Sequence, residues 1–264
     1  MTVRRALAVV VCALVVAGCE AHSIAPPAVT PVPVTTPSPE TTAPPRTTQT
    51  TQTTPPRQVL APPSTGITFP RSGSGQWLFP TGDGPVAGQA GRLLRYRIAI
   101  EGDIAGVTTD GFVKAVESTL ADPRGWTGGG RWRLQRVGPE GRYDFTIYLA
   151  TPKTRDVLCG RPDGYTSCRN GNSVVLNVAR WADAVPGYGA PLEVYRQYMI
   201  THEVGHRLGR GHETCPVPGA LAPVMQQQTL GMHGCAPNPW PYPDGTQYSG
   251  PSGEYDDPIP RGDS

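Results

Sequence analysis

The sequence predicts an α+β domain over residues 66–242, because segments with the spacing of strands and of helices follow one another there. Apolar and polar residues alternate in residues 94–101, which is the period of a half-buried strand. In residues 112–120 the apolar positions recur instead at helical spacing. The predicted order is one strand, one helix, three strands and a last helix, and the length suffices for one hydrophobic core.

The first helix has a signal at each end. Thr109 or Asp110 can cap its N-terminus through a side-chain oxygen, and Pro123 with Gly125 ends it.

Three strands are predicted after this helix. Trp132 and Leu134 indicate the first, and residues 145–149 alternate clearly enough to predict the second. The third is the apolar run of residues 173–178, which follows the turn-rich residues 169–172.

The last helix is predicted to start near Pro191, since proline suits a first helical turn. Leu192, Tyr195 and Met199 lie on one face of this helix, which continues through residues 202–206.

Residues 202–212 fit the pattern H-E-x-x-H-x-x-G-x-x-H at every fixed position and hold three of the chain's five histidines. His202 and His206 project from the same face of a helix, because residues four apart lie one above the other. Gly209 can adopt the left-handed conformation that ends helices, which allows His212 to return as a third ligand. Three protein ligands leave the fourth tetrahedral position to water, as in a catalytic zinc site.

Glu203 stands beside the first histidine and is placed to take a proton from that water. These eleven residues resemble the zinc signature of the metzincin metallopeptidases, a resemblance that implies Zn²⁺ as the cofactor and Glu203 as the catalytic base. Metzincins also place a methionine in a tight turn beneath the metal. Met225, within A-P-V-M-Q, stands at a suitable distance for that role; ordinary core packing is the other interpretation of this residue.

The resemblance implies a fold as well as a site. A metzincin-like catalytic domain has a twisted mixed sheet with two helices, the second carrying the zinc motif, and a small irregular C-terminal subdomain. The substrate cleft lies between the two parts. In that family the strand at the edge of the cleft pairs with an extended substrate, and residues 173–178 are our candidate for it.

The region from about residue 93 to residue 240 also resembles an uncharacterised family of exported actinobacterial lipoproteins that carry this motif. Residues 195–198, 222–229 and 238–241 carry that resemblance. It implies the fold but brings no substrate with it.

Several residues near the motif differ from known metzincin branches or have no role assigned by the resemblance. Some branches have a tyrosine after the methionine turn, whereas residues 226–228 are glutamines here, so that role is vacant or filled from a distance by Tyr242. We expect His233 on the surface rather than in the cleft. Glu213 follows the third ligand, where the astacin branch binds its mature N-terminus, but a tethered N-terminus could not be buried there.

Residues 1–18 have the basic start and short apolar run of a signal peptide. The ending V-A-G-C resembles a lipobox, which implies that Cys19 receives a lipid; secretion with Cys19 incidental is the alternative. Residues 19–65 are dominated by Pro and Thr and predict a disordered tether. The domain is therefore expected outside the cytoplasmic membrane, anchored to its outer face.

Residues 243–264 are rich in Pro, Gly and acidic residues and predict a flexible tail, in which the R-G-D of residues 261–263 is interpreted as accidental. Removal of residues 1–18 takes away two arginines and no acid, so the net charge of +2 becomes about 0. Without a basic stripe there is no case for nucleic-acid binding. We expect a monomer that acts on a peptide or protein in the cell envelope.

Four cysteines remain after export with a lipidated Cys19, and an even number argues for two disulfides. Proximity favours Cys159 with Cys168 and Cys215 with Cys235, although four cysteines allow three connectivities. As an alternative, C-G-R-P-D from Cys159 resembles the cysteine switch of matrixin pro-segments. In that case a free thiolate would keep the enzyme latent and Cys168 would be unpaired.

Three functions compete at this point. The first is a membrane-anchored zinc endopeptidase, and the second is a zinc hydrolase of another amide, such as a peptidoglycan stem peptide or a small molecule. The third is a tethered binding domain with a non-catalytic zinc. Glu203 argues against the third, because a structural zinc needs no base.

Overall fold

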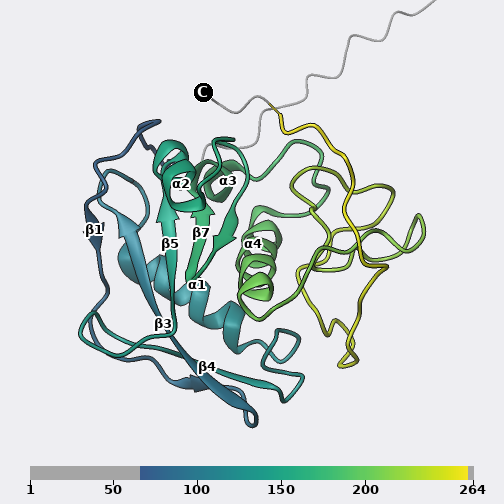
Figure 1. Cartoon of the computed structure of the whole chain (residues 1–264), viewed down its shortest axis with the longest axis horizontal. Coiled ribbons are helices and arrows are strands. Elements are labelled where there is room, and N and C mark those ends of the chain that lie inside the picture. The colour runs from purple at the N-terminus through teal and green to yellow at the C-terminus, as the bar shows by residue number, and fades with distance from the viewer. Residues whose placement is uncertain (1–65, 261–264) are drawn as a thin grey trace, which may run out of the picture. The chain divides into compact units, whose positions relative to one another are not determined.

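The computed structural model describes residues 66–260, and a seven-stranded mixed sheet runs through them (Figure 1). The strands lie in the order β2 (Val86–Ala87), β4 (Trp132–Arg136), β3 (Arg92–Glu101), β5 (Phe145–Ala150), β7 (Ser173–Asn177) and β6 (Cys168–Asn170), and β1 (Trp77–Leu78) also pairs with β3. The four central strands are parallel, whereas β1, β2 and β6 join them antiparallel. The result is a mixed α/β fold.

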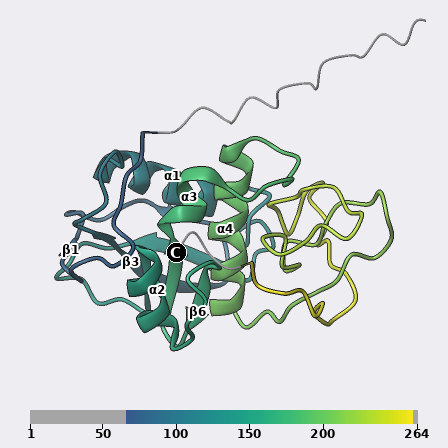
Figure 2. The same ribbon diagram turned by 90° about the horizontal axis from the view of Figure 1, so that it is seen from above.

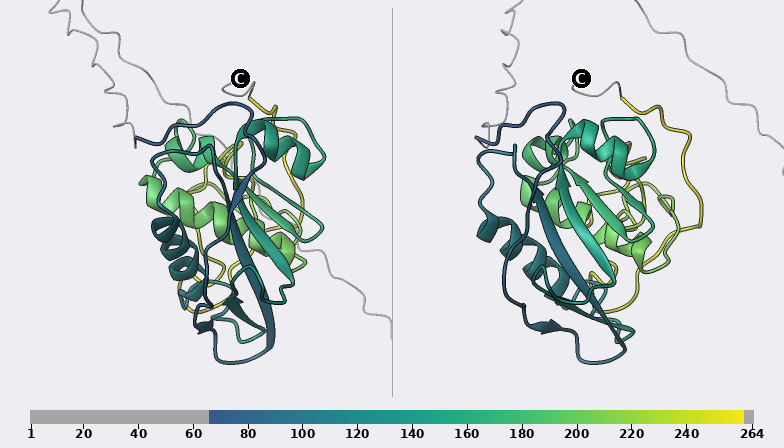
Figure 3. Two further views of the ribbon diagram at one scale, coloured as in Figure 1. Left: turned by 90° about the vertical axis from the view of Figure 1, so that its left-hand side faces the viewer. Right: turned by 60° about the vertical axis from the view of Figure 1, so that its left-hand side comes forward.

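Helices cover both faces of the sheet (Figures 2 and 3). The helices are α1 (Thr109–Ala121), α2 (Pro152–Cys159), α3 (Val178–Asp183) and α4 (Leu192–Arg207). Helices α1 and α4 pack against each other on one face, and α2 lies on the other. From residue 208 to residue 260 the described chain forms only turns, loops and isolated bridges, beside α4.

The core lies between the sheet and the pair α1 and α4. Every second residue of β3 from Leu94 to Ile100 is buried there, as the alternation predicts. Phe112 and Val116 of α1 and Met199 of α4 close the core from the helix side. Thr108, one residue before the predicted caps, accepts a hydrogen bond from the Gly111 N–H and caps α1.

The half-buried character predicted for β3 is wrong at its C-terminal end. Ala99 and Glu101, on the supposed solvent face, are fully buried. The carboxylate of Glu101 accepts hydrogen bonds from the N–H of Gly75, the N–H of Thr151 and the hydroxyl of Thr154. The chain before β1 and the start of α2 therefore cover this end, and their polar groups satisfy the buried carboxylate.

Two short helices were not predicted from the sequence. Helix α2 has 8 residues and α3 has 6, so neither is long enough for helical periodicity to stand out. Asn177 caps α3 by accepting a hydrogen bond from the Ala179 N–H, so the predicted strand of residues 173–178 ends one residue early. Gly160 ends α2 in the left-handed conformation, which glycine adopts at no steric cost.

The predicted position of residues 173–178 at the edge of the sheet is also wrong. Strand β7 lies between β5 and β6, so β6 is the edge strand. The turn that the sequence indicated in residues 169–172 joins β6 to β7 as a hairpin, in which Asn170 pairs with Ser173. Strand β6 has only three residues, two of them polar, and gives no period-2 signal of its own.

The predicted signal peptide, Cys19, the tether of residues 19–65 and the R-G-D of residues 261–263 lie outside the described residues. Within residues 66–260, none of the helices has both the length and the apolar character needed to cross a membrane.

Candidate metal centre

Helix α4 carries the first two histidines in a buried setting. Pro191 occupies its N-cap position, one residue before the predicted helical start. His202 and Glu203 are both nearly inaccessible to solvent, whereas His206, one turn later, is partly exposed. The ring of Tyr198 packs beside that of His202 and fixes it from the N-terminal side of the helix.

The chain turns sharply after α4 and returns the third histidine. Gly209 has a φ of +86°, and the Arg210 N–H donates to the Gly205 carbonyl, which closes the helix end. The Nε2 atom of His206 lies 3.1 Å from Nε2 of His202 and 3.1 Å from Nε2 of His212. The helix spacing and the glycine turn therefore bring the three rings together as the sequence predicted.

The other ring nitrogen of each histidine has an oxygen partner. His202 Nδ1 donates to the Val224 carbonyl at 2.8 Å, and His206 Nδ1 donates to the Arg210 carbonyl at 2.8 Å. His212 Nδ1 lies 2.7 Å from Oε2 of Glu254. Carbonyl and carboxylate oxygens accept, so the ring hydrogens stay at Nδ1 and the Nε2 lone pairs face one another. Three lone pairs this close repel unless a cation lies among them, so the donor set fits a metal ion.

Burial favours the neutral form of these rings. It lowers the pKa of His202 well below the usual range, and the neighbouring histidines lower it further. It also lowers the pKa of His206 to about 4. Since a metal binds the neutral imidazole, the two helical ligands are ready at neutral pH.

Glu203 shares a cavity of about 260 Å³ with the three histidines. Its Oε2 atom is buried and has no hydrogen-bond partner within the described residues. Burial raises the pKa of Glu203 to about 8, against the opposing charges of Arg155 and Arg169. A buried carboxylate oxygen without a protein partner is available to a molecule in the cavity.

Met225 packs against helix α4, which carries His202 and His206. Gln226 N–H donates to the Pro223 carbonyl and closes a tight turn around Met225, which is almost fully buried. A side chain at Gly205 would meet the Met225 sulfur at 2.5 Å, so the two are in close contact. The preceding residue, Val224, supplies the carbonyl that orients His202. The Met225 turn therefore contacts the helix that carries His202 and His206 and supplies the hydrogen-bond partner of His202.

Both favoured disulfides are present. Cys159 is bonded to Cys168, which joins the end of α2 to β6, and Cys215 is bonded to Cys235 around the Met225 turn. The bond of Cys159 contradicts the cysteine-switch alternative, because no free thiolate is left to reach the metal. Two disulfides indicate an oxidising environment.

The glutamines after Met225 differ in their surroundings. Gln226 and Gln228 are buried and donate to backbone carbonyls of their own loop, so they hold the turn together. Gln227 lines the cavity. Tyr242, the distant candidate for a tyrosine in the site, does not line it, and its hydroxyl donates to Gln247.

The segment after residue 242, predicted to be a flexible tail, packs on the C-terminal part of the domain as far as residue 260. Glu254 contacts His212, and Ile259 lines the cavity. His233 lies outside the cavity lining, where its ring stacks on Tyr255 and contacts Asp257.

The contact of a glutamate with the third candidate ligand, His212, was not predictable from the sequence. Glu254 lies 42 positions after His212 in a segment without periodicity, so only the fold brings the two together. Glu213 accepts a hydrogen bond from the Gly250 N–H, which fixes the same segment.

Comparison with known families gives one match. A family model described as "Protein of unknown function (DUF3152)" matches residues 63–243. No curated protein and no solved structure matches the chain.

Proposed function

The chain belongs to the family described as proteins of unknown function DUF3152, and we propose that it is a zinc-dependent peptidase of the cell envelope with a metzincin-like catalytic domain. One observation carries the proposal: the unpaired carboxylate oxygen of Glu203 and three converging imidazole nitrogens share one cavity. A structural metal site needs no such base and is usually closed by a fourth protein ligand.

The donor set supports zinc as the metal. Three imidazoles, each with an oxygen partner at Nδ1, are the ligands of many catalytic zinc sites, and here all three histidines line the cavity. Zinc in such a site lowers the pKa of water toward neutrality and polarises a carbonyl group.

The protein itself supplies the proton transfer. Glu203 takes a proton from the attacking water and later delivers it to the leaving nitrogen. A dication nearby favours the ionised carboxylate and so counteracts the effect of burial on the pKa of Glu203.

The edge of the sheet supports a peptide as the substrate. Strand β6 pairs with β7 on one side only, and Cys168 and Arg169 of β6 line the cavity. An extended peptide could add to this edge as a further antiparallel strand, as substrates do in the metzincins.

The N-terminal sequence and the disulfides support a location outside the cytoplasmic membrane. A signal peptide at residues 1–18 and a lipid on Cys19 would hold the domain at the outer face of the membrane. The tether of residues 19–65 would let it reach substrates in the envelope.

The test compares the full chain with its Glu203→Ala variant. The wild-type chain should bind about one zinc, measured by elemental analysis, and cleave members of an unbiased peptide library detected by mass spectrometry. The variant should keep the zinc and lose the cleavage. Full activity in the variant would contradict the mechanism, and a chain with no affinity for added zinc would contradict the site. Release of fragments from cell-wall material, with no peptide cleaved, would favour a stem-peptide amide instead.

A further inference from the structure

Two arginines on the cavity wall have no acidic partner. Arg161, after α2, and Arg169, on β6, are both exposed and both line the cavity that holds the three histidines. Within residues 66–260 neither guanidinium forms an ion pair or a hydrogen bond. An unpaired arginine fork at a cavity wall is the usual protein ligand for a carboxylate.

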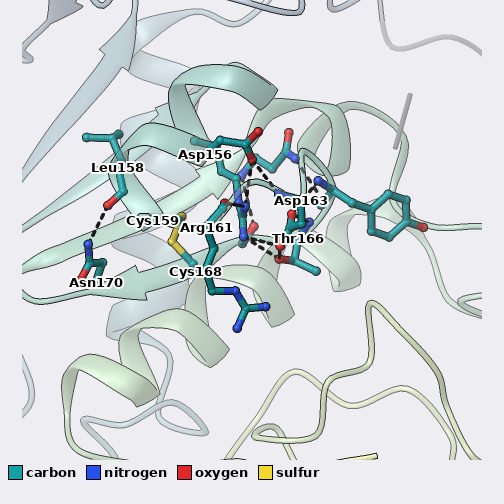
Figure 4. The surroundings of a disulfide bond; sticks show 12 residues. Asp156, Leu158, Cys159, Arg161, Asp163, Thr166, Cys168 and Asn170 are labelled. Atoms are coloured by element: carbon teal, nitrogen blue, oxygen red, sulfur yellow. Dashed lines mark hydrogen bonds and ion pairs between the residues drawn. A yellow bond between two sulfur atoms is a disulfide. The ribbon is translucent and has the colours of Figure 1, made fainter. Parts of the chain in front are cut away.

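A frame made of the Cys159–Cys168 disulfide and buried ion pairs lies beside Arg161 (Figure 4). The Cys159–Cys168 disulfide joins the segments of the two arginines, because Cys159 comes two residues before Arg161 and Cys168 directly precedes Arg169. The buried guanidinium of Arg155 donates to the backbone carbonyl of Arg161 at 2.8 Å and so fixes that residue from behind. In Figure 4 the Arg161 side chain itself extends away from this network.

The buried arginine of the frame has acidic partners, in contrast to the two exposed arginines. Arg155 pairs with Asp156 at 3.0 Å and with Asp163 at 2.7 Å. Its positive charge is therefore neutralised within the frame. The charges of Arg161 and Arg169 are the ones left for a ligand.

The strand geometry directs Arg169 toward the metal side of the sheet. Its neighbours Cys168 and Asn170 both contact α2, through the disulfide and through a hydrogen bond to the Leu158 carbonyl. Side chains alternate along a strand, so Arg169 points to the opposite face. It pairs in register with Val174, whose side chain packs in the core beneath α4.

The cavity lining is therefore strongly asymmetric in charge. Its only acidic residue is Glu203, which the proposed mechanism already uses, whereas Arg161 and Arg169 are unused. We infer that Arg161 and Arg169 bind a carboxylate of the substrate, so that peptides with an acidic group close to the cleaved bond are preferred. This inference rests on the proposed peptidase function. The carboxylate is an acidic side chain or the free C-terminus of a short peptide.

Binding to a chain that cannot cleave tests this inference apart from the activity. The full-length Glu203→Gln variant, loaded with zinc, is mixed with a labelled peptide library that contains glutamate and with a matched library that contains glutamine. Each library is made with a free and with an amidated C-terminus, and binding is followed by fluorescence anisotropy. Arg161→Gln with Arg169→Gln, in the same background, is the test variant. Arg131→Gln is the control, since Arg131 is an exposed arginine outside the cavity lining.

The acidic library should bind on the order of tenfold more tightly than its amide counterpart, and added salt should weaken that preference. The arm that shows the preference, side chain or C-terminus, identifies the carboxylate. The double variant should lose the preference, and Arg131→Gln should keep it. Equal binding of acid and amide, no binding of either, or a preference that survives in the double variant would overturn the inference. Cleavage of peptides by the wild type without any preference would do the same, yet leave the peptidase function standing. Tighter binding of the acidic library, with no peptide cleaved by the wild type, would contradict the peptidase function and leave the carboxylate site standing.

Discussion

Glu254 accepts a hydrogen bond from Nδ1 of His212 at 2.7 Å, and the backbone N–H of Gly253 donates to the His212 carbonyl at 3.1 Å. The C-terminal segment thus holds the third histidine by both its ring and its backbone. The backbone carbonyls of Val224 and Arg210 orient His202 and His206. His212 depends instead on a carboxylate from a distant segment. Such a partner fixes the ring orientation and raises the basicity of the ligand nitrogen.

Removal of the Glu254 carboxylate should weaken metal binding. Glu254→Ala is expected to lower zinc affinity about 10- to 100-fold, because His212 loses the group that fixes its tautomer. Competition with a chromophoric chelator measures this. Glu254→Gln, which keeps an acceptor but no charge, should fall between. Glu140, an exposed glutamate without a described partner, serves as the control position, and an Ala variant there should bind zinc like the wild type. An unchanged affinity in Glu254→Ala would show that the contact does not orient the ligand.

The close contact between α4 and the Met225 turn makes Gly205 intolerant of a side chain. A Cβ there would lie 2.5 Å from the Met225 sulfur and 2.8 Å from the Trp126 ring. Gly205→Ala should destabilise the metal-free chain by about 1–3 kcal/mol through overpacking, despite a gain in helix propensity of up to about 1 kcal/mol. Urea denaturation measures the difference.

Gly211 provides the matched control within the same motif. A Cβ at Gly211 meets nothing within 4 Å, and its φ is not in the left-handed region. Gly211→Ala should therefore leave stability close to that of the wild type. Equal stabilities of the two alanine variants would mean that Met225 is not packed against the helix as described.

The residues of the site that lie close together in the sequence were predictable from their spacing. The i, i+4 placement of His202 and His206 and the positive φ of Gly209 follow from helix geometry and from the lack of a Cβ in glycine. Glu254, Arg161 and Arg169 were missed, because each contributes through the tertiary fold and belongs to no local pattern. A sequence shows that these residues are charged, but it does not show which other residue each charge contacts.

The fold was predictable to a similar degree. Strands β3 and β5 and helices α1 and α4 are long enough for their hydrophobic period to be read, and β7 stands out as an apolar run. Strand β6 and helices α2 and α3 are too short for that. Because β6 was not predicted, β7 was wrongly expected to be the edge strand. The identity of an edge strand depends on strand pairing and not on composition.

Acid should weaken the frame behind the arginines through Asp156. Burial by itself raises the pKa of Asp156, but hydrogen bonds from the Gly164 N–H, Arg155, the Asp163 N–H and Lys153 outweigh it and hold the pKa below the usual range. A carboxyl whose folded pKa is lower than its unfolded pKa stabilises the fold above the unfolded value of about 3.9. That contribution is lost as the pH falls through the folded pKa.

Asp156→Asn should therefore destabilise the chain at pH 7 by about 1–3 kcal/mol, since Asn keeps an acceptor but lacks the charge that strengthens the hydrogen bonds from Arg155, Lys153 and two backbone N–H groups. The stability difference from the wild type should shrink as the pH falls below about 4. Denaturant titrations of both proteins at several pH values give this comparison. A difference that stays constant from pH 7 to pH 3 would contradict the assigned role of the carboxylate.

Zinc should stabilise the fold through the histidines and not through Glu203. A metal that binds only the folded chain, present at about 100 times its Kd, adds about 2.7 kcal/mol, which corresponds to a rise in Tm of about 5–10 °C for a domain of this size. His206 lies between the other two ligands, at 3.1 Å from each, so His206→Ala should abolish the rise. Glu203→Gln should keep it, because Glu203 acts on the molecule in the fourth position and holds no metal itself. Thermal unfolding with zinc or with a chelator separates these cases. A rise that survives in His206→Ala would place the metal elsewhere, and one that disappears in Glu203→Gln would make Glu203 a ligand and not a base.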